Sequence, residues 1–170
     1  MGDLIDKETR KARDFIFGVG YFSEIIIALV VIYALNKNLL DISIFIFFFF
    51  LSGYSNTLFK SFIKQPRPDE PKKFLYSEHF SRVNKVYGMP SGHSQNVFYS
   101  ITYLYLIAKD GMYWLQLGLV LATLMVYERW TFHNHTLLQL FAGAMMGIAL
   151  GIVVYSIRNK IYSSLILGAK

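Results

Sequence analysis

The chain has 170 residues, of which 54% are hydrophobic and 16% charged, and it contains no cysteine. Soluble domains carry about a quarter charged residues, so this composition excludes an ordinary soluble domain and indicates an integral membrane protein. The lack of cysteine excludes disulfides, thiolate nucleophiles and zinc–thiolate sites. The net charge of +6 suits anionic headgroups or phosphorylated substrates, but lysine and arginine also flank ordinary membrane helices.

Five apolar runs predict an all-α membrane bundle of about five transmembrane helices, forming one domain over residues 1–170. A bilayer core of about 30 Å needs about 20 helical residues. The second and fifth runs have this length, whereas the third and fourth are short and are joined only by 109–111, which predicts a tight turn. The runs cover residues 17–35, 42–59, 92–108, 112–127 and 137–157.

Two further features refine this bundle. The first 17 residues are predicted to form a short helix on the membrane surface, which would bring the number of helices to six. Gly143, Gly147 and Gly151 recur at four-residue spacing in the fifth run. Small residues on one helix face let a second helix approach closely in lipid, so this spacing indicates helix packing.

Three polar clusters are predicted to meet on one side of the membrane. They lie at residues 60–68, 90–93 and 128–139, each at an end of an apolar run. Counting the crossings from the N-terminus places all three on the same side, together with the long polar stretch 61–89. This convergence makes that side of the bundle the candidate functional site.

The first cluster is cationic. Lys60, Lys64 and Arg67 would share one helix face if the helix continued, but Pro66 and Pro68 predict that it breaks and leaves Arg67 extended. A lysine paired with an arginine fork is typical of phosphate-binding sites. A cation that snorkels at a helix end explains any one of them alone, and Lys64 in particular.

The second cluster, Pro90-Ser91-Gly92-His93, opens the third run. Pro90 favours a turn, Gly92 allows close approach of a ligand, and Ser91 is a plausible helix cap. A helix that begins here directs unpaired N–H groups outward and so forms an anion site. His93 in its first turn can donate a proton to the bound group.

The third cluster contains a second histidine. His135 opens the fifth run, and Gln139 lies one helical turn later on the same face. A histidine nucleophile needs one ring nitrogen free and the other held by an acceptor, which the Gln139 amide oxygen can supply. Arg129 adds a third cation six residues before His135.

Taken together, Lys60-x6-Arg67-Pro68, Pro90-Ser91-Gly92-His93 and Arg129-x5-His135 resemble the three signatures of the type-2 phosphatidic-acid phosphatase superfamily. The resemblance implies a metal-independent phosphatase that works through a phosphohistidine. It implies that His135 is the nucleophile and His93 the general acid. It also implies a set of phosphate-binding residues: Lys60, Arg67, Ser91, Gly92 and Arg129.

Two positions depart from the family pattern. Glu128 stands where a serine is usual, and Gln139 stands where an aspartate is usual. The stretches "YGMPSGHSQ" and "HTLLQ" are similar to the dolichyl-diphosphatase group, in which a glutamine occurs at the place of Gln139. That similarity implies hydrolysis of a polyprenyl diphosphate to the monophosphate.

Other readings stay open. Phosphatidic acid, phosphatidylglycerophosphate, undecaprenyl diphosphate and a lipid A phosphate are alternative substrates. A catalytically inactive lipid-binding relative is an alternative of a different class, for which Gln139 and Glu128 are the best evidence. A metal site on His93, His133 and His135 lacks carboxylates at ligand spacing.

The expected partners are a lipid phosphate and the bilayer, with no cofactor, metal or nucleic acid, and the oligomeric state is left open. Lysine and arginine counts favour a cytoplasmic site, whereas the resemblance implies a site facing the endoplasmic reticulum lumen or the extracytoplasmic side. Glu24 is an acid inside the first run on the side of the motifs, and such carboxylates are either functional or interfacial.

Overall fold

The computed structural model describes residues 2–35, 38–69 and 87–168, with the backbone alone for 2–8 and 168. Helices make up nearly all of these ranges, and the predicted all-α fold is confirmed. The five helices are α1 (Gly2–Ala34), α2 (Leu39–Ile63), α3 (Gly92–Ile107), α4 (Gly111–Thr131) and α5 (Leu137–Gly168). The predicted turn at 109–111 corresponds to the short connection between α3 and α4.

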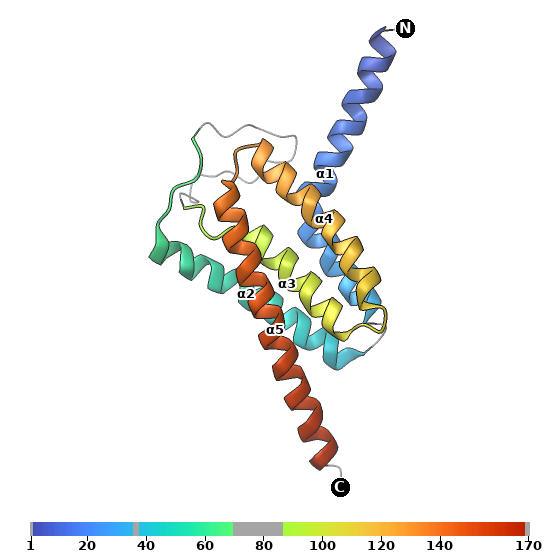
Figure 1. The fold of residues 1–170 in the computed structure, drawn as a ribbon, viewed down its shortest axis with the longest axis vertical. Helices are drawn as coiled ribbons and strands as arrows, with labels where there is room; N and C mark the ends of the chain where they lie inside the picture. Colours follow the sequence, from blue (N-terminus) through green and yellow to red (C-terminus); the bar gives the residue numbers. More distant parts are fainter. Residues whose placement is uncertain (1, 36–37, 70–86, 169–170) are drawn as a thin grey trace.

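Three of the described helices are long and apolar enough to cross a membrane: Thr9–Ala34 of α1, Leu39–Ile63 of α2 and Leu137–Leu167 of α5. The central helix, α3, has only 16 residues and packs against all four others (Figure 1). Since its neighbours cover it, α3 can carry buried polar side chains such as Gln95 and Asn96.

The separate interfacial helix that the sequence suggested is not present in the described part of the chain. α1 instead runs without interruption from Gly2 to Ala34, and its N-terminal part projects beyond the bundle (Figure 1). The physical reason is the composition of residues 7–13, "KETRKAR", which contains good helix formers and neither proline nor glycine. Nothing in this stretch ends the helix before the apolar run begins.

The glycine stripe of α5 packs against α3, as its spacing predicted. A Cβ on Gly143 would overlap the Ser91 carbonyl oxygen, and a Cβ on Gly147 would overlap the carbonyl oxygen of Gln95. The backbones of α3 and α5 therefore approach closely. This contact brings the beginnings of the two helices together, where two of the three polar clusters lie.

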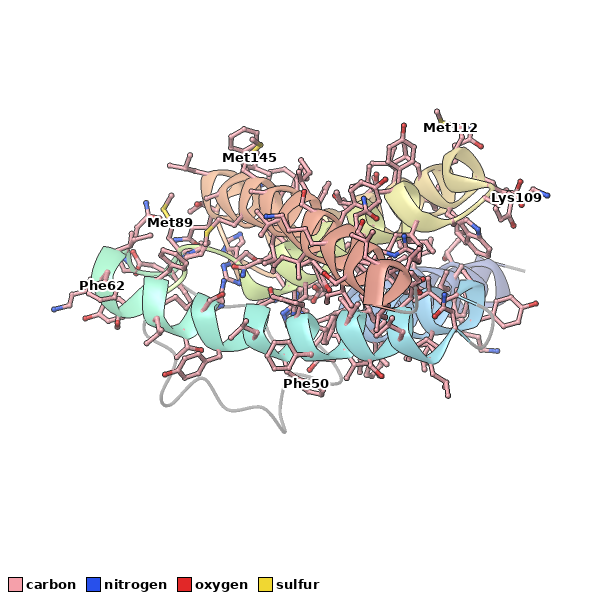
Figure 2. All side chains as sticks on the ribbon, turned by 90° about the horizontal axis from the view of Figure 1, so that it is seen from below. Phe50, Phe62, Met89, Lys109, Met112 and Met145 are labelled. Atoms are coloured by element: carbon pink, nitrogen blue, oxygen red, sulfur yellow. The ribbon has the colours of Figure 1, made fainter. Side chains whose placement is uncertain are left out.

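The outer surface of the bundle is apolar. Phe50 and Phe62 of α2, Met112 of α4 and Met145 of α5 project away from their helices (Figure 2), and all four side chains are exposed. Exposed apolar surface on this scale is typical of helices that contact lipid rather than water.

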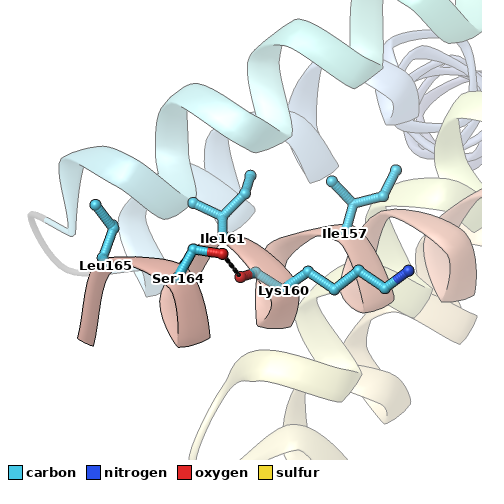
Figure 3. Close-up of a pocket in the computed structure, with 5 residues that line it drawn as sticks. All are labelled: Ile157, Lys160, Ile161, Ser164 and Leu165. Atoms are coloured by element: carbon cyan, nitrogen blue, oxygen red, sulfur yellow. Dashed lines mark hydrogen bonds between the residues drawn. The ribbon is translucent and has the colours of Figure 1, made fainter. Parts of the chain in front are cut away.

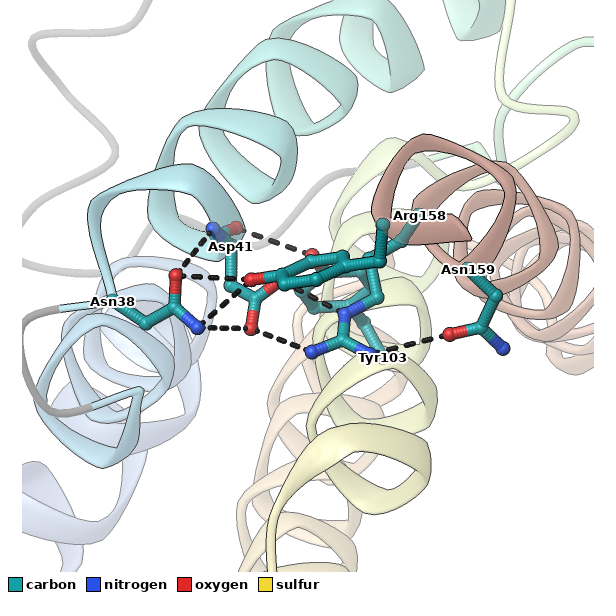
Figure 4. A network of polar contacts seen from close by, with 6 residues as sticks. Asn38, Asp41, Tyr103, Arg158 and Asn159 are labelled. Atoms are coloured by element: carbon teal, nitrogen blue, oxygen red, sulfur yellow. Dashed lines mark hydrogen bonds and ion pairs between the residues drawn. The ribbon is translucent and has the colours of Figure 1, made fainter. Parts of the chain in front are cut away.

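A polar network joins the helices at the opposite end of α2 from the clusters (Figure 4). Arg158 donates from Nε and Nη2 to the two Asp41 carboxylate oxygens, at 2.8 and 2.9 Å. The Tyr103 hydroxyl donates to the Asp41 carbonyl oxygen at 3.1 Å. Because these contacts connect α2, α3 and α5, the network fixes the bundle without taking part in the candidate site.

Candidate active site

Two of the three motifs meet directly at one end of the bundle. Arg67 Nη1 donates to the Asn134 carbonyl oxygen at 2.9 Å and lies 3.2 Å from His135 Nε2. The segment that carries Arg67 is extended after α2 ends, because Pro66 pairs with Tyr87 and the Gly88 N–H donates to the Gln65 carbonyl oxygen. The predicted break of the helix before Arg67 therefore places this guanidinium against the imidazole.

The orientation of His135 follows from the amide of Gln139. Gln139 Nε2 donates to the Pro66 carbonyl oxygen at 2.7 Å, and Gln139 Oε1 accepts from the Thr136 backbone N–H at 3.2 Å. These partners fix the amide oxygen on the side of His135, whose Nδ1 lies 3.3 Å from it. An oxygen can only accept, so Nδ1 carries the proton and Nε2 keeps its lone pair. The free nitrogen is the one that faces Arg67.

The carbonyl contact of Gln139 also gives a physical reason for an amide where the family usually has a carboxylate. An oxygen in place of Nε2 would face the Pro66 carbonyl oxygen and the Gln65 Oε1, which are both acceptors. A carboxylate at this buried position would lose two hydrogen bonds and gain a repulsive contact.

We therefore expect Gln139→Glu to destabilise the protein by about 1–3 kcal/mol, the cost of an unsatisfied buried polar group. Thermal unfolding in detergent measures this change. Thr136→Ser is the matched control, since it keeps the hydroxyl that accepts from the Gln139 N–H. An unfolding temperature for Gln139→Glu equal to that of the wild type would contradict this role of the amide.

Positive charge surrounds His135. The side chain is only 3% exposed. Burial lowers the pKa of His135 well below its usual range, and the charges of Arg67, Lys60 and Arg129 lower it further. The hydrogen bond to Gln139 raises the pKa, but its effect is smaller. All three predicted phosphate-binding cations therefore act on this histidine, and together with burial they favour its neutral imidazole.

Arg129 is buried and has hydrogen-bonding capacity to spare. Its Nε lies 3.0 Å from Glu128 Oε2, close enough for an ion pair but without hydrogen-bond alignment. Among the described residues, Nη2 has no hydrogen-bond partner, and the guanidinium carbon lies 5.0 Å from the centre of the Tyr21 ring. A buried donor without a partner is costly unless an anion accepts from it. This arrangement suits a bound phosphoryl group.

The turn before α3 is held by backbone and side-chain contacts. The Ser91 N–H donates to the Gln139 carbonyl oxygen at 3.0 Å, which joins the second motif to the third. The Ser91 hydroxyl accepts from the Ser94 N–H at 3.4 Å and caps the helix as expected. Asn56 of α2 donates to the Pro90 carbonyl oxygen at 3.3 Å. A Cβ on Gly92 would lie 3.1 Å from Asn56 Oδ1, so glycine fits closely here.

His93 is the more exposed of the two site histidines. Its side chain is 37% exposed, and Nε2 lies 3.5 Å from Glu24 Oε2 of α1. The sequence drew attention to Glu24 but gave no sign of this partner. It also gave no sign of Asn56, Gln65 or Asn134, whose roles depend on carbonyls and turns that only the folded chain brings together.

Two other features of the described residues concern metal binding and a groove. Residues 2–35, 38–69 and 87–168 contain no group of three or more His, Cys, Asp or Glu side chains able to hold a metal ion. The alternative ligand set of His93, His133 and His135 does not form such a group. A shallow groove also lies along the second half of α5 (Figure 3), away from the motifs. It is lined by Ile157, Lys160, Ile161, Ser164 and Leu165.

Comparison with known proteins agrees with the motifs. Residues 41–163 match the model of the PAP2 superfamily. Dolichyldiphosphatase 1 of Dictyostelium discoideum is 30% identical over 148 residues, which cover 81% of this chain and 61% of that protein. The chain thus spans less than two thirds of the length of this relative. No solved structure matches the chain. The chain belongs to the PAP2 superfamily, and with its apolar helices it is an integral membrane member of that phosphatase family.

Proposed function

We propose that this protein is a metal-independent lipid phosphatase that converts a polyprenyl diphosphate to the monophosphate through a phosphohistidine. The observation that carries the proposal is the geometry of His135: Nδ1 is held by Gln139, and Nε2 lies beside Arg67 among three cations. A relative named for dolichyl diphosphate supports the choice of substrate.

In the first step His135 Nε2 attacks the terminal phosphorus. Lys60, Arg67 and Arg129, with the N–H groups at the beginning of α3, stabilise the charge on the equatorial oxygens, which is the main demand in phosphoryl transfer. The bond from phosphorus to the bridging oxygen breaks, and His93 donates a proton to the departing lipid monophosphate.

In the second step water attacks the phosphohistidine. The neutral His93 accepts a proton from that water, inorganic phosphate departs, and His135 returns to its starting state. Because the motifs lie at the ends of apolar helices, the polyprenyl chain remains in the bilayer throughout both steps. We further propose that this end of the bundle faces the endoplasmic reticulum lumen or the extracytoplasmic side.

Phosphate release by the purified protein in detergent with EDTA tests the proposed function. The substrates are a polyprenyl diphosphate, its monophosphate and phosphatidic acid. We expect release from the diphosphate in the presence of EDTA. Release that requires an added metal would overturn the metal-independent mechanism. Faster release from phosphatidic acid would assign a different substrate, and no release from any of the three would favour an inactive relative.

The pH dependence of kcat/KM gives a second test. Nucleophilic attack needs unprotonated His135, and burial and the neighbouring cations lower the pKa of this residue. Activity should therefore persist as the pH falls through the ordinary histidine range. The acid limb of the profile, where kcat/KM falls with decreasing pH, should lie well below the usual histidine pKa of about 6.5.

Lys60→Met is the matched variant for this test. Removal of one positive charge makes protonation of His135 easier, so the acid limb should move to higher pH. Ionisation of the substrate is the same for both proteins and cannot produce the difference. An acid limb that does not move would contradict the electrostatic role of Lys60.

A further inference from the structure

Glu24 is an acid in an unusual position. It lies within the apolar segment Thr9–Ala34 of α1, and its side chain is only 22% exposed. A carboxylate in such surroundings is costly unless it is paired. None of the steps described above uses it.

Two residues of α3 contact this carboxylate. Asn96 Nδ2 donates to Glu24 Oε1 at 2.6 Å, and His93 Nε2 lies 3.5 Å from Glu24 Oε2. His93 and Asn96 are three residues apart on α3, so both face the same side of that helix. Asn96 therefore fixes one carboxylate oxygen and leaves the other directed at the imidazole.

The electrostatics of the site create a need for such a carboxylate. A general acid must be protonated at the moment when the nucleophile beside it is neutral. The cations Arg67, Lys60 and Arg129 disfavour a positive charge on His135, so a proton on a second histidine of the same site needs a nearby negative charge. A carboxylate 3.5 Å from His93 Nε2 favours a proton on His93, and it can thereby separate the protonation states of the two histidines.

We propose that Glu24 is a positioning residue for His93, which holds Nε2–H and stabilises the imidazolium that protonates the leaving group. This inference rests on the proposed function. With Nε2 held by Glu24, the proton travels from Nδ1–H to the bridging oxygen as its bond to phosphorus breaks. In the second step Nδ1 accepts a proton from the attacking water, which restores the imidazolium.

The other ionisable groups at this end of the bundle come from every element packed around α3. Among the described residues they include Tyr21 of α1, Lys60 and Lys64 at the end of α2, Arg67 of the extended segment, Glu128 and Arg129 of α4, and His133 and His135 before α5. A substitution at Glu24 leaves all of them in place. A change in the pH profile is assigned to the contact between Glu24 and His93 when the titration of His93 itself changes as well.

The test is the pH profile of kcat/KM for Glu24→Gln. The amide keeps the size of the side chain and its hydrogen bond to Asn96 but removes the negative charge. His93 should then lose its proton at lower pH, so the alkaline limb should move to lower pH while the acid limb stays. At pH 8 we expect a loss of about tenfold, less than the roughly 10²–10⁴-fold that general acid catalysis contributes, because His93 itself remains.

Two further variants complete the comparison. Glu24→Asp retains the charge and should restore most of the alkaline limb. Asp14→Asn removes a carboxylate elsewhere on α1, one that pairs with Arg13, and should leave the profile unchanged. A purely structural role would give both limbs at their original pH, with lower activity at every pH, and that result would overturn the inference.

A titration that needs no turnover separates this inference from the proposed function. The ring signals of His93 are followed by NMR in detergent, with His93→Gln used for their assignment. The pH at the midpoint of the His93 titration should be lower in Glu24→Gln than in the wild type, whether or not the protein releases phosphate. An unchanged midpoint would overturn the role of Glu24 even in an active enzyme. A lower titration midpoint of His93 in Glu24→Gln, in a protein that releases no phosphate, would support the contact between Glu24 and His93 and contradict the proposed function.

Discussion

Replacement of His135 by alanine should reduce phosphate release at least about 10⁴-fold, the scale seen when a residue that acts in a catalytic unit is removed. The variant should remain folded, because the neighbouring polar groups keep other partners. Arg67 still donates to the Asn134 carbonyl oxygen, and the Gln139 amide oxygen still accepts from the Thr136 N–H. Phosphate release and thermal unfolding in detergent measure the two effects.

His133→Asn is the control for this experiment. His133 is a histidine of the same loop with a positive φ of 53°, a backbone conformation that asparagine tolerates. We expect its activity to stay within about threefold of the wild type, since none of the proposed steps uses the His133 side chain. A folded His135→Ala protein with activity near that of the wild type would rule out the phosphohistidine mechanism.

Arg67→Ala should have the second largest effect, with a loss of about 10²–10³-fold in kcat/KM. Arg67 joins three features: the extended segment after α2, the Asn134 carbonyl oxygen and the free nitrogen of His135. Its loss removes the positive charge that would stabilise the transferred phosphoryl group. It also removes the donor that holds the loop at the Asn134 carbonyl oxygen. Arg67→Lys should recover little, because an ammonium does not reproduce the planar fork of a guanidinium.

Lys64 is the matched control among the cations. It ends α2 with a positive φ of 51°, and its side chain is exposed. Lys64→Asn suits that conformation and removes one charge three residues before Arg67. Its activity should stay close to that of the wild type. Equal losses for Lys64→Asn and Arg67→Ala would mean that overall charge, rather than the position of Arg67, supports catalysis.

The sequence was sufficient to predict the helices because each apolar run, including the two short ones, is bounded by turn-forming or charged residues. The predicted third run, 92–108, and α3 differ by one residue at the end. The main error concerned α1. Its charged N-terminal turns do not look like part of a membrane helix, yet good helix formers continue the hydrogen-bonded ladder from Gly2.

The convergence of the motifs could also be predicted, because it follows from counting membrane crossings. The Gln139 amide could be assigned to His135 from one-turn spacing alone. Its second contact, with the Pro66 carbonyl oxygen, could not. That contact depends on how the chain returns after α2, which no local pattern encodes.

Glu24 and Glu128 mark the limit of prediction from the sequence. Both were visible as acids in unusual places, but their partners were not. Glu24 meets a histidine of another helix, which requires the packing of α1 on α3. Glu128 lies beside Arg129, its neighbour in sequence, at the end of α4. Adjacent residues on a helix usually point in different directions, so this pair could not be expected from spacing.

Trapping of the covalent intermediate tests the central claim most directly. The protein is mixed with a polyprenyl diphosphate labelled in its terminal phosphate, in detergent with EDTA, and is denatured in alkali within one turnover. The geometry of His135 predicts an acid-labile, alkali-stable label on that residue, attached at Nε2, and no label in His135→Ala. Phosphate release without any labelled protein, or a label on another residue, would contradict the claim that His135 is the nucleophile.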